Sequence, residues 1–422
     1  MRKLAVENFS VIKGTRDFEF GNITAIIGPQ SSGKSVLSRL AFFGVEAINI
    51  AIKSLSDLAT YGQFQATIKE DFQSYFPVST WGAKPFEIVY RQGEFQISIS
   101  RRSSQKQLSN KLNLSFSRPF KDAYEHALAS LRPSDEESSR RNPILLPSVR
   151  LRRTLESALG EDSSANQTFI PAGRSFFTSV GRAIVAFEES GSLDPLTIRF
   201  GRQIRWDDPR IPTRMSLRTK REIQDMPLAL ERESASLLGG SVKFERDKPY
   251  FAAKDGRKLP LSWLSSGQQE LLPLLATLRQ RCFLSEPQTL YIEEPEAHIF
   301  PEAQRQLVSL LARISYHPHM RTSMVLTTHS PYFLSAFNNL IYAGQLANEK
   351  PELKNQIARI VPEHFWIANG TFRAYCIHDG ELKSIISESG LIDGTYLDSV
   401  SETIGNEFDS LLRLEYDDTK AS

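Results

Sequence analysis

A glycine-rich stretch near the start of the chain has the residues and the spacing of a phosphate-binding loop. Its sequence, GPQSSGKS, follows the apolar segment NITAII and precedes a long helical pattern. In such a loop the backbone N–H groups surround the phosphates of a nucleotide, the lysine bridges the terminal phosphates, and the last hydroxyl coordinates Mg²⁺. The pattern predicts a nucleotide site formed by Gly28, Pro29, Gln30, Ser31, Ser32, Gly33, Lys34 and Ser35, with Ser35 as a metal ligand.

Two adjacent carboxylates end a second apolar segment, TLYIEE. A carboxylate at the end of a strand can hold Mg²⁺, and its neighbour can polarise an attacking water. We therefore predict that Glu293 is the metal-side acid and Glu294 the catalytic base; the alternative is that both are solvated charges. Further along, VLTTHS brings His329 to the end of another apolar segment, where it could sense a terminal phosphate and hold the attacking water, or simply cap a helix.

A run of small polar residues, SSGQQ, precedes the leucine-rich stretch ELLPLLATL. Ser265, Ser266, Gly267 and Gln268 could cap a helix, because side-chain oxygens at that position accept hydrogen bonds from its first N–H groups. The same residues could hold a phosphate, because glycine lets a ligand approach the backbone and the helix dipole favours an anion. The stretch alone leaves both interpretations open.

The order of these motifs resembles that of ABC-type ATPases, in particular the branch that includes RecF, SMC proteins and the OLD-family nucleases. IEEPEAHIFPEAQ and TTHSPYFL are similar to the ATPase domains of OLD-family proteins and of related ATPases in bacterial anti-phage defence. The resemblance covers residues 1–50 and 236–335. It implies an ATPase that uses ATP and Mg²⁺ and dimerises around ATP, with Ser266 and Gly267 contacting the γ-phosphate held by the opposite subunit. Ser266 departs from the transporter form LSGGQ, which argues against a transporter subunit.

The resemblance also implies roles for residues outside these motifs. ATPases of this kind use a glutamine between the lobes to sense Mg²⁺ and the attacking water, and Gln63, Gln65 and Gln73 are all candidates. The segment FIPAGRSFF is similar to the same family and places Arg174 near the nucleotide or the dimer seam. OLD-family nucleases also carry a metal-dependent Toprim domain with a DxD pair, and residues 331–422 contain no such pair. We therefore expect that this chain does not itself cut nucleic acid.

Alternating and apolar segments predict the elements that carry the motifs. The first 27 residues are expected to form strands, residues 86–101 a hairpin, residues 111–117 a further strand and residues 241–263 a second β segment. The prediction is an α/β P-loop NTPase of ABC type with an antiparallel β subdomain, a central parallel sheet and a mainly helical inserted lobe. Its parts are an ATPase lobe at 1–50, an inserted hairpin and helical lobe at 51–235, the rest of the ATPase lobe at 236–345 and a helical C-terminal extension at 346–422.

Composition narrows the class of protein. The chain has 422 residues, of which 40% are hydrophobic and 24% charged, as in a soluble globular protein. No apolar run approaches the ~20 residues that span a bilayer, so we expect no membrane segment. Two cysteines, Cys282 and Cys376, form neither a zinc motif nor a disulfide framework, and a cytoplasmic setting is expected.

Charge is unevenly distributed along the chain. Arginines are concentrated between residues 140 and 221, and acidic residues within 381–422. The basic region could face nucleic acid or an acidic partner, or be a solvated face. In the tail, an apolar stripe with helical spacing either packs on the protein's own core or docks a partner protein. The stripe comprises Leu397, Val400, Ile404, Phe408, Leu411 and Leu412.

These observations favour an ATP-dependent switch. A homo-oligomer, with the ATP-dependent dimer as its minimal unit, would close on ATP and control a separate effector such as a nuclease in anti-phage defence. The alternative is a RecF- or SMC-like DNA-binding clamp in repair or chromosome maintenance, although residues 51–235 contain no long heptad-repeat arms. A nucleotide-gated scaffold with incidental hydrolysis is a third hypothesis.

Overall fold

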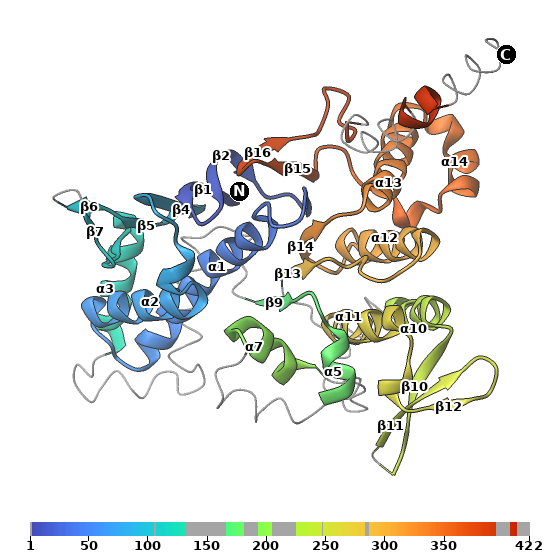
Figure 1. The fold of residues 1–422 in the computed structure, drawn as a ribbon, viewed down its shortest axis with the longest axis horizontal. Helices are drawn as coiled ribbons and strands as arrows, with labels where there is room; N and C mark the ends of the chain where they lie inside the picture. Colours follow the sequence, from blue (N-terminus) through green and yellow to red (C-terminus); the bar gives the residue numbers. More distant parts are fainter. Residues whose placement is uncertain are drawn as a thin grey trace.

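One large sheet forms the centre of the computed structural model, which describes residues 2–104, 107–131, 166–180, 193–204, 225–246, 248–282, 287–393 and 406–411. Its eleven strands have the order β8-β5-β4-β1-β2-β16-β15-β3-β14-β13-β9 (Figure 1). They are β1 (Arg2–Phe9), β2 (Ile12–Glu19), β3 (Ile23–Ile27), β4 (Phe86–Gln92), β5 (Phe95–Arg101), β8 (Asn113–Phe116), β9 (Gln167–Ile170), β13 (Gln288–Glu293), β14 (Thr322–Thr328), β15 (Phe372–His378) and β16 (Glu381–Ser384).

Two small sheets and the helices complete the described part of the chain. β10 (Gly240–Glu245), β11 (Lys248–Ala253) and β12 (Lys258–Leu259) form one small sheet, and β6 (Ser103–Ser104) pairs with β7 (Gln107–Leu108). The helices are α1 (Lys34–Ser56), α2 (Tyr61–Tyr75), α3 (Arg118–Leu131), α5 (Ser175–Val180), α7 (Pro195–Gln203), α10 (Asp225–Leu238), α11 (Ser266–Arg281), α12 (Pro301–Ser315), α13 (Pro331–Glu349) and α14 (Lys354–Ile360). The predicted hairpin at 86–101 is confirmed by β4 and β5.

The large sheet is parallel on one side and antiparallel on the other. β9, β13, β14, β3 and β15 run parallel to one another in that spatial order. β1, β2, β4, β5 and β8 form antiparallel pairs on the other side. The structure thus confirms the predicted α/β fold with an antiparallel part and a central parallel part, and joins the two in a single sheet.

Apolar side chains bury both faces of the parallel strands. In β3, Ile26 belongs to the cluster that includes α1, whereas Ile23, Ala25 and Ile27 belong to the cluster that includes α11, α12 and α13. Successive side chains of a strand point to opposite faces, so a strand covered on both faces is apolar throughout. This explains why the segment before the phosphate loop is a continuous apolar run.

Among the described helices, α1 has the length and hydropathy of a membrane span. However, 67% of its apolar window is buried inside the protein, and Leu37, Ala41 and Phe42 are completely buried. The expectation that no segment approaches the apolarity of a span is therefore wrong for this helix. Its apolar character is explained by packing in the core, where it connects the phosphate loop to the sheet.

Two segments differ from the predicted elements. The C-terminal extension was expected to be helical, but it contains β15 and β16, which lie between β3 and β2; Figure 1 shows these red strands beside the blue ones. The inserted lobe was expected to be a hairpin with helices, but its β9 pairs with β13 at the sheet edge. Both expectations were wrong because these short strands find their partners only among residues far away in the sequence.

Parts of the charge and tail predictions fall on residues outside the described ranges. This applies to the arginines at 140–153 and 205–221 and to Leu397, Val400, Ile404 and Leu412 of the apolar stripe. Of the stripe, Phe408 and Leu411 are described, and they are 61% and 63% exposed.

The position of β15 in the sheet gives a testable prediction. Ile377 is completely buried in this strand. We expect Ile377→Ala to lower the free energy of unfolding by about 2–5 kcal/mol, because it removes buried methyl groups and leaves a cavity. Urea denaturation measures this loss, with Ile360→Ala as the control, since Ile360 is 82% exposed. Equal effects of the two substitutions would show that β15 does not lie inside the sheet.

Candidate functional site

Four neighbouring parallel strands end at one edge of the sheet, and each is followed by residues singled out in the sequence. β3 leads into the phosphate loop, β14 into His329, β13 into the acidic pair and β9 into the segment that contains Arg174. Ligands of open α/β sheets bind outside the carboxyl ends of the strands. The structure therefore brings the phosphate loop, the acids and the histidine together at the edge where chemistry is expected.

The backbone of the phosphate loop requires its small residues. Gly33 has φ 107° and Ser31 has φ 60°, both in the left-handed region that favours glycine. A Cβ on Gly28 would lie 2.3 Å from the carbonyl oxygen of Ile377, so the loop packs directly on β15. The Ser32 hydroxyl is buried and has no hydrogen-bond partner within the described protein. A buried polar atom without a partner fits a loop whose partner is a phosphate.

Lys34 begins α1 and extends over the loop. Its Nζ donates hydrogen bonds to the carbonyl oxygens of Gly28 (2.9 Å) and Pro29 (2.7 Å) and lies 3.4 Å from Nδ1 of His329. Burial lowers the pKa of Lys34, and the nearby carboxylates of Glu294 and Glu296 oppose this shift. The ammonium group is thus held at the point where the loop, the acids and the histidine meet.

Glu293 has the environment of a metal-binding acid. It is only 3% exposed, and its Oε2 accepts a hydrogen bond from the N–H of Ala172 (3.3 Å). Its Oε1 is buried without a hydrogen-bond partner, 3.8 Å from Nε of Arg39. Burial raises the pKa of Glu293, and Arg39 and the Ser35 hydroxyl oppose the shift. The Ser35 hydroxyl lies near the Glu293 carboxylate, and the carboxylate oxygen that has no hydrogen-bond partner fits a cation such as Mg²⁺.

No group of three or more His, Cys, Asp and Glu side chains forms a metal site among the residues that the structure describes. A magnesium ion at Ser35 and Glu293 would therefore take its other ligands from nucleotide phosphates and water. This is the usual way in which phosphate sites bind Mg²⁺.

Glu294 and His329 form the accessible pair of the site. Oε1 of Glu294 lies 3.3 Å from Nε2 of His329, and each side chain is 35% exposed. Glu294 has φ 43°, and its N–H donates to the carbonyl oxygen of Thr327 (2.9 Å) at the end of β14. This turn directs the carboxylate toward the histidine, with enough exposure for a water molecule to reach both.

Glu296 is a site residue that the sequence analysis missed. It is 8% exposed, and its Oε1 accepts hydrogen bonds from the Thr328 hydroxyl and from the His329 N–H, both at 2.7 Å. Burial raises the pKa of Glu296, and these two hydrogen bonds oppose the shift. Glu296 therefore fixes the backbone that carries the histidine. In the sequence Glu296 is the third acid of EEPE. It does not end an apolar segment, so the pattern that predicted Glu293 and Glu294 does not include it.

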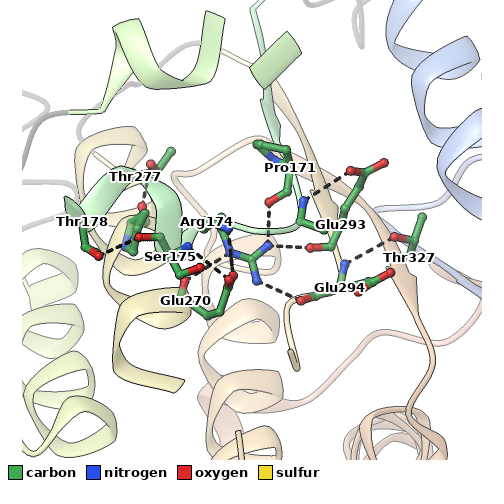
Figure 2. A network of polar contacts seen from close by, with 11 residues as sticks. Pro171, Arg174, Ser175, Thr178, Glu270, Thr277, Glu293, Glu294 and Thr327 are labelled. Atoms are coloured by element: carbon green, nitrogen blue, oxygen red, sulfur yellow. Dashed lines mark hydrogen bonds and ion pairs between the residues drawn. The ribbon is translucent and has the colours of Figure 1, made fainter. Parts of the chain in front are cut away.

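Arg174 lies deep in the protein rather than at its surface. Its side chain is completely buried and connects β9, α11 and the residues after β13 (Figure 2). Burial lowers the pKa of Arg174, and the carboxylate of Glu270 is the strongest opposing influence. The prediction that Arg174 lies near the nucleotide site is consistent with these contacts, which place it directly behind the acidic pair.

The start of α11 shows which of its polar residues cap the helix. Ser265 is the N-cap and forms a capping box with Gln268: each side chain accepts a hydrogen bond from the backbone N–H of the other. The amide of Gln268 also donates to the carbonyl oxygen of Leu238 (2.7 Å). Ser265 and Ser266 are exposed. The cap interpretation is thus confirmed for Ser265 and Gln268, while contact of Ser266 and Gly267 with a phosphate remains a prediction.

The three candidate glutamines lie on one helix. Gln63 forms the capping box of α2 with Thr60, and Gln65 and Gln73 follow on the same helix. The carboxylate of Glu293 accepts from the N–H of Ala172, which follows β9, and lies beside Arg39 of α1. Which glutamine senses the metal stays a prediction.

Comparison with known protein families shows the family to which the chain belongs. The family model whose description names an AAA domain, the AbiEii toxin and a type IV TA system matches residues 23–335. No curated protein matches the chain.

Solved structures provide more distant likenesses. The chain is similar to an SMC head bound to the C-winged helix domain of ScpA, with a TM-score of 0.43, 12% identity and coverage of 91% of this chain and 96% of that chain. For the SMC head domain from Thermotoga maritima the TM-score is 0.35, the identity 15% and the coverage 92% and 99%. For an ATP-binding cassette of an ABC transporter in its ADP conformation they are 0.32, 11%, and 91% and 90%. These TM-scores are low, so the assignment rests on the family model and on the site. The chain belongs to this family of AAA-domain proteins and is a P-loop ATPase.

Proposed function

We propose that the chain is a Mg²⁺-dependent ATPase that dimerises around ATP and thereby switches a separate effector. One observation carries the proposal. The carboxylate of Glu294, the imidazole of His329 and the ammonium of Lys34 meet at one edge of the sheet. Nε2 of His329 lies 3.3 Å from Oε1 of Glu294, and Nδ1 of His329 lies 3.4 Å from Nζ of Lys34. This is the arrangement needed to activate a water molecule beside a terminal phosphate.

Each residue has a distinct part in hydrolysis. The loop from Gly28 to Ser35 binds the phosphates, and Lys34 exchanges its hydrogen bonds to loop carbonyls for phosphate oxygens. Ser35 and Glu293 would hold the metal, and Mg²⁺ bound there would supply positive charge to neutralise the phosphates. Glu294 accepts a proton from the attacking water. His329 orients that water through the nitrogen that faces Glu294.

The exposed start of α11 supports a shared site. Ser266 is exposed and lies at the N-terminus of a long helix, where N–H groups and the helix dipole attract anions. We propose that it contacts the γ-phosphate held by a second copy of the chain. Loss of that phosphate would then remove the differential contact that stabilises the closed dimer.

The proposed biological role is the control of a separate effector. The family description names a toxin of a TA system. Control of an effector such as a nuclease in anti-phage defence, in the cytoplasm, is proposed from the similarity of IEEPEAHIFPEAQ and TTHSPYFL to ATPases of such systems. The DNA-clamp alternative depends on the arginines between 140 and 221, most of which lie outside the described residues. Salt-dependent, sequence-indifferent DNA binding by the purified chain would favour that alternative.

The shared site gives a prediction for the mass of the protein in solution. Glu294→Gln leaves nucleotide binding intact but removes the base, so we expect this variant to form a stable dimer in ATP and Mg²⁺ and to hydrolyse ATP at least about a hundredfold more slowly than wild type. Adding Ser266→Arg should return it to the mass seen without ATP, because the bulky cation blocks the surface facing the partner. Light scattering after size exclusion measures both masses.

Two results decide this experiment. Lys34→Ala serves as the control for nucleotide binding and should not dimerise in ATP, because the buried ammonium that bridges the terminal phosphates is gone. A mass of Glu294→Gln that is indifferent to ATP would reject the ATP-dependent dimer. Wild-type hydrolysis by Glu294→Gln would reject Glu294 as the base.

The burial of Glu293 gives a prediction about stability and metal. Because burial raises its pKa, the folded protein binds this proton more tightly than the unfolded chain, and stability falls as pH rises from the usual carboxylate range through the raised pKa. Glu293→Gln carries no ionisable proton, so we expect the nucleotide-free variant to melt a few degrees above wild type at neutral pH. We also expect it to lose hydrolysis and the additional stabilisation that Mg²⁺ gives to the ATP-bound protein.

Thermal melting with and without ATP and Mg²⁺ measures these effects, and Glu302→Gln is the matched control. Glu302 is exposed, and hydrogen bonds from Arg305 and Gln306 lower its pKa to about 2. Neutralising it should not raise the melting temperature and should leave the response to Mg²⁺ unchanged. A Glu293→Gln variant that still hydrolyses ATP with Mg²⁺ would reject Glu293 as the metal-side acid.

A further inference from the structure

We infer that Arg174 and Glu270 couple the start of α11 to the catalytic turn, defined here as residues 293–298, so that a phosphate contacted by α11 changes the geometry of the acidic pair. The inference rests on the proposed dimer, because only there does α11 meet a phosphate. In that dimer α11 of one protomer faces its partner's nucleotide, whereas the catalytic turn of the same protomer serves its own nucleotide. The coupling therefore links the two ATP sites.

The guanidinium of Arg174 holds the backbone of the acidic pair. Nη1 donates to the carbonyl oxygens of Pro171 (2.9 Å) and Glu293 (2.5 Å), and Nη2 donates to that of Glu294 (2.9 Å) (Figure 2). Both carbonyls of the acidic pair are thus fixed by one rigid, planar group. Because the orientation of these peptides sets the direction of the side chains, Arg174 controls where the carboxylates of Glu293 and Glu294 point.

Glu270 ties Arg174 to α11. This residue is 2% exposed and lies four positions after Ser266, one helical turn along α11. Its Oε2 accepts from the Arg174 N–H (3.0 Å), its Oε1 accepts from the Ser175 N–H (3.1 Å), and its carbonyl oxygen accepts from Nε of Arg174 (3.2 Å). Figure 2 shows Arg174 between Glu270 on one side and the acidic pair on the other. A shift of α11 is therefore transmitted to both the backbone and the side chain of Arg174.

A second contact joins the same two parts. A Cβ on Gly267 would lie 2.6 Å from the carbonyl oxygen of His298, so the first turn of α11 packs directly on the end of the catalytic turn. Gly267 contacts the end of the catalytic turn at His298, and Arg174, which Glu270 holds, contacts its start. The turn is therefore joined to α11 at both of its ends. Close-packed interiors transmit small displacements rather than absorbing them.

The buried charges indicate a role beyond stability. A buried ion pair often stabilises a fold no better than apolar side chains of the same size. Here, however, the guanidinium donates to three main-chain oxygens, one of Pro171 just after β9 and two of the predicted metal-side acid and base in the catalytic turn. An apolar pair in the same space would fill the volume but would leave these carbonyls without donors.

The test compares ATP hydrolysis against ATP concentration for wild type, Glu270→Gln and Arg174→Lys. We expect a sigmoidal curve for wild type, because each site responds to nucleotide at the other. Glu270→Gln keeps one acceptor but loses the charge, and Arg174→Lys keeps the charge but loses the planar fork. Both should lower kcat about tenfold and give hyperbolic curves, while ATP affinity measured without Mg²⁺ stays within about twofold of wild type. A merely structural role would lower ATP affinity along with kcat.

A matched control uses the ion pair between Arg313 on α12 and Glu233 on α10, which also joins two helices (2.6 Å) but includes no residue of α11 or of the catalytic turn. Glu233→Gln should leave kcat and the sigmoidal curve unchanged. If Glu270→Gln does not fold, Arg174→Lys, which retains the cation, carries the test. A hyperbolic wild-type curve, or a wild-type kcat with cooperativity in either variant, would overturn the coupling.

The experiments distinguish failure of the proposed coupling from failure of the proposed dimer. We expect Glu270→Gln combined with Glu294→Gln to dimerise in ATP as Glu294→Gln does, because the surface facing the partner is intact. Failure of Glu294→Gln alone to dimerise would overturn the dimer, and the coupling with it. Dimerisation of Glu294→Gln together with unchanged kinetics of Glu270→Gln would overturn the coupling alone.

Discussion

The parallel pairing of β9, β13, β14 and β3 is the constraint on which the site depends. These strands are adjacent in the sheet and point the same way, so the residues that follow them meet at one edge. Neighbouring strands lie about 4.8 Å apart, so a side chain at the end of one strand can reach the residues at the end of the next strand. The phosphate loop, His329, the acidic pair and Arg174 therefore lie side by side although β9 and β3 are far apart in sequence. The helices α11, α12 and α13 enforce this order by covering the face of these strands that carries Ile23 and Leu290.

At this edge of the sheet several buried polar and charged groups are not fully satisfied by hydrogen bonds within the described protein. Burial opposes the charged forms of Lys34, Glu293 and Glu296, and Oε1 of Glu293 and Oγ of Ser32 have no hydrogen-bond partner within the described protein. Such groups lower the stability of a fold unless a ligand supplies the missing interactions. A nucleotide with its metal ion would bring both, so binding and folding are linked. The atoms without hydrogen-bond partners indicate the position of the site, because burying such atoms costs free energy unless a ligand bonds to them.

The sequence was sufficient to predict the local motifs and the elements next to them. GPQSSGKS, TLYIEE and VLTTHS each join an apolar strand to a functional residue, and that signal is local. It was insufficient where a role depends on distant partners. β9 and β15 are recognisable only once β13 and β3 are beside them. Glu270 reads as one polar residue in a helix, and the expected position of Arg174 near the nucleotide or the dimer seam did not include its contacts with Glu270, which only the fold reveals. Glu296 was missed for the same reason, because the groups it binds belong to β14 and the residue after it.

The start of α11 shows how one short motif can satisfy two demands that the sequence presents as alternatives. The cap is made by Ser265 and Gln268, and it uses the N–H group of Gln268, the third of the helix. The N–H groups of Ser266 and Gly267 and the Ser266 hydroxyl are left to other partners. Capping the helix from inside the protomer fixes its N-terminus without occupying the face that points outward. In the proposed dimer an anion would meet the start of this helix, and Glu270 lies one turn further along. The small residues thus serve the fold and the proposed partner contact together, since different atoms of the motif meet each demand.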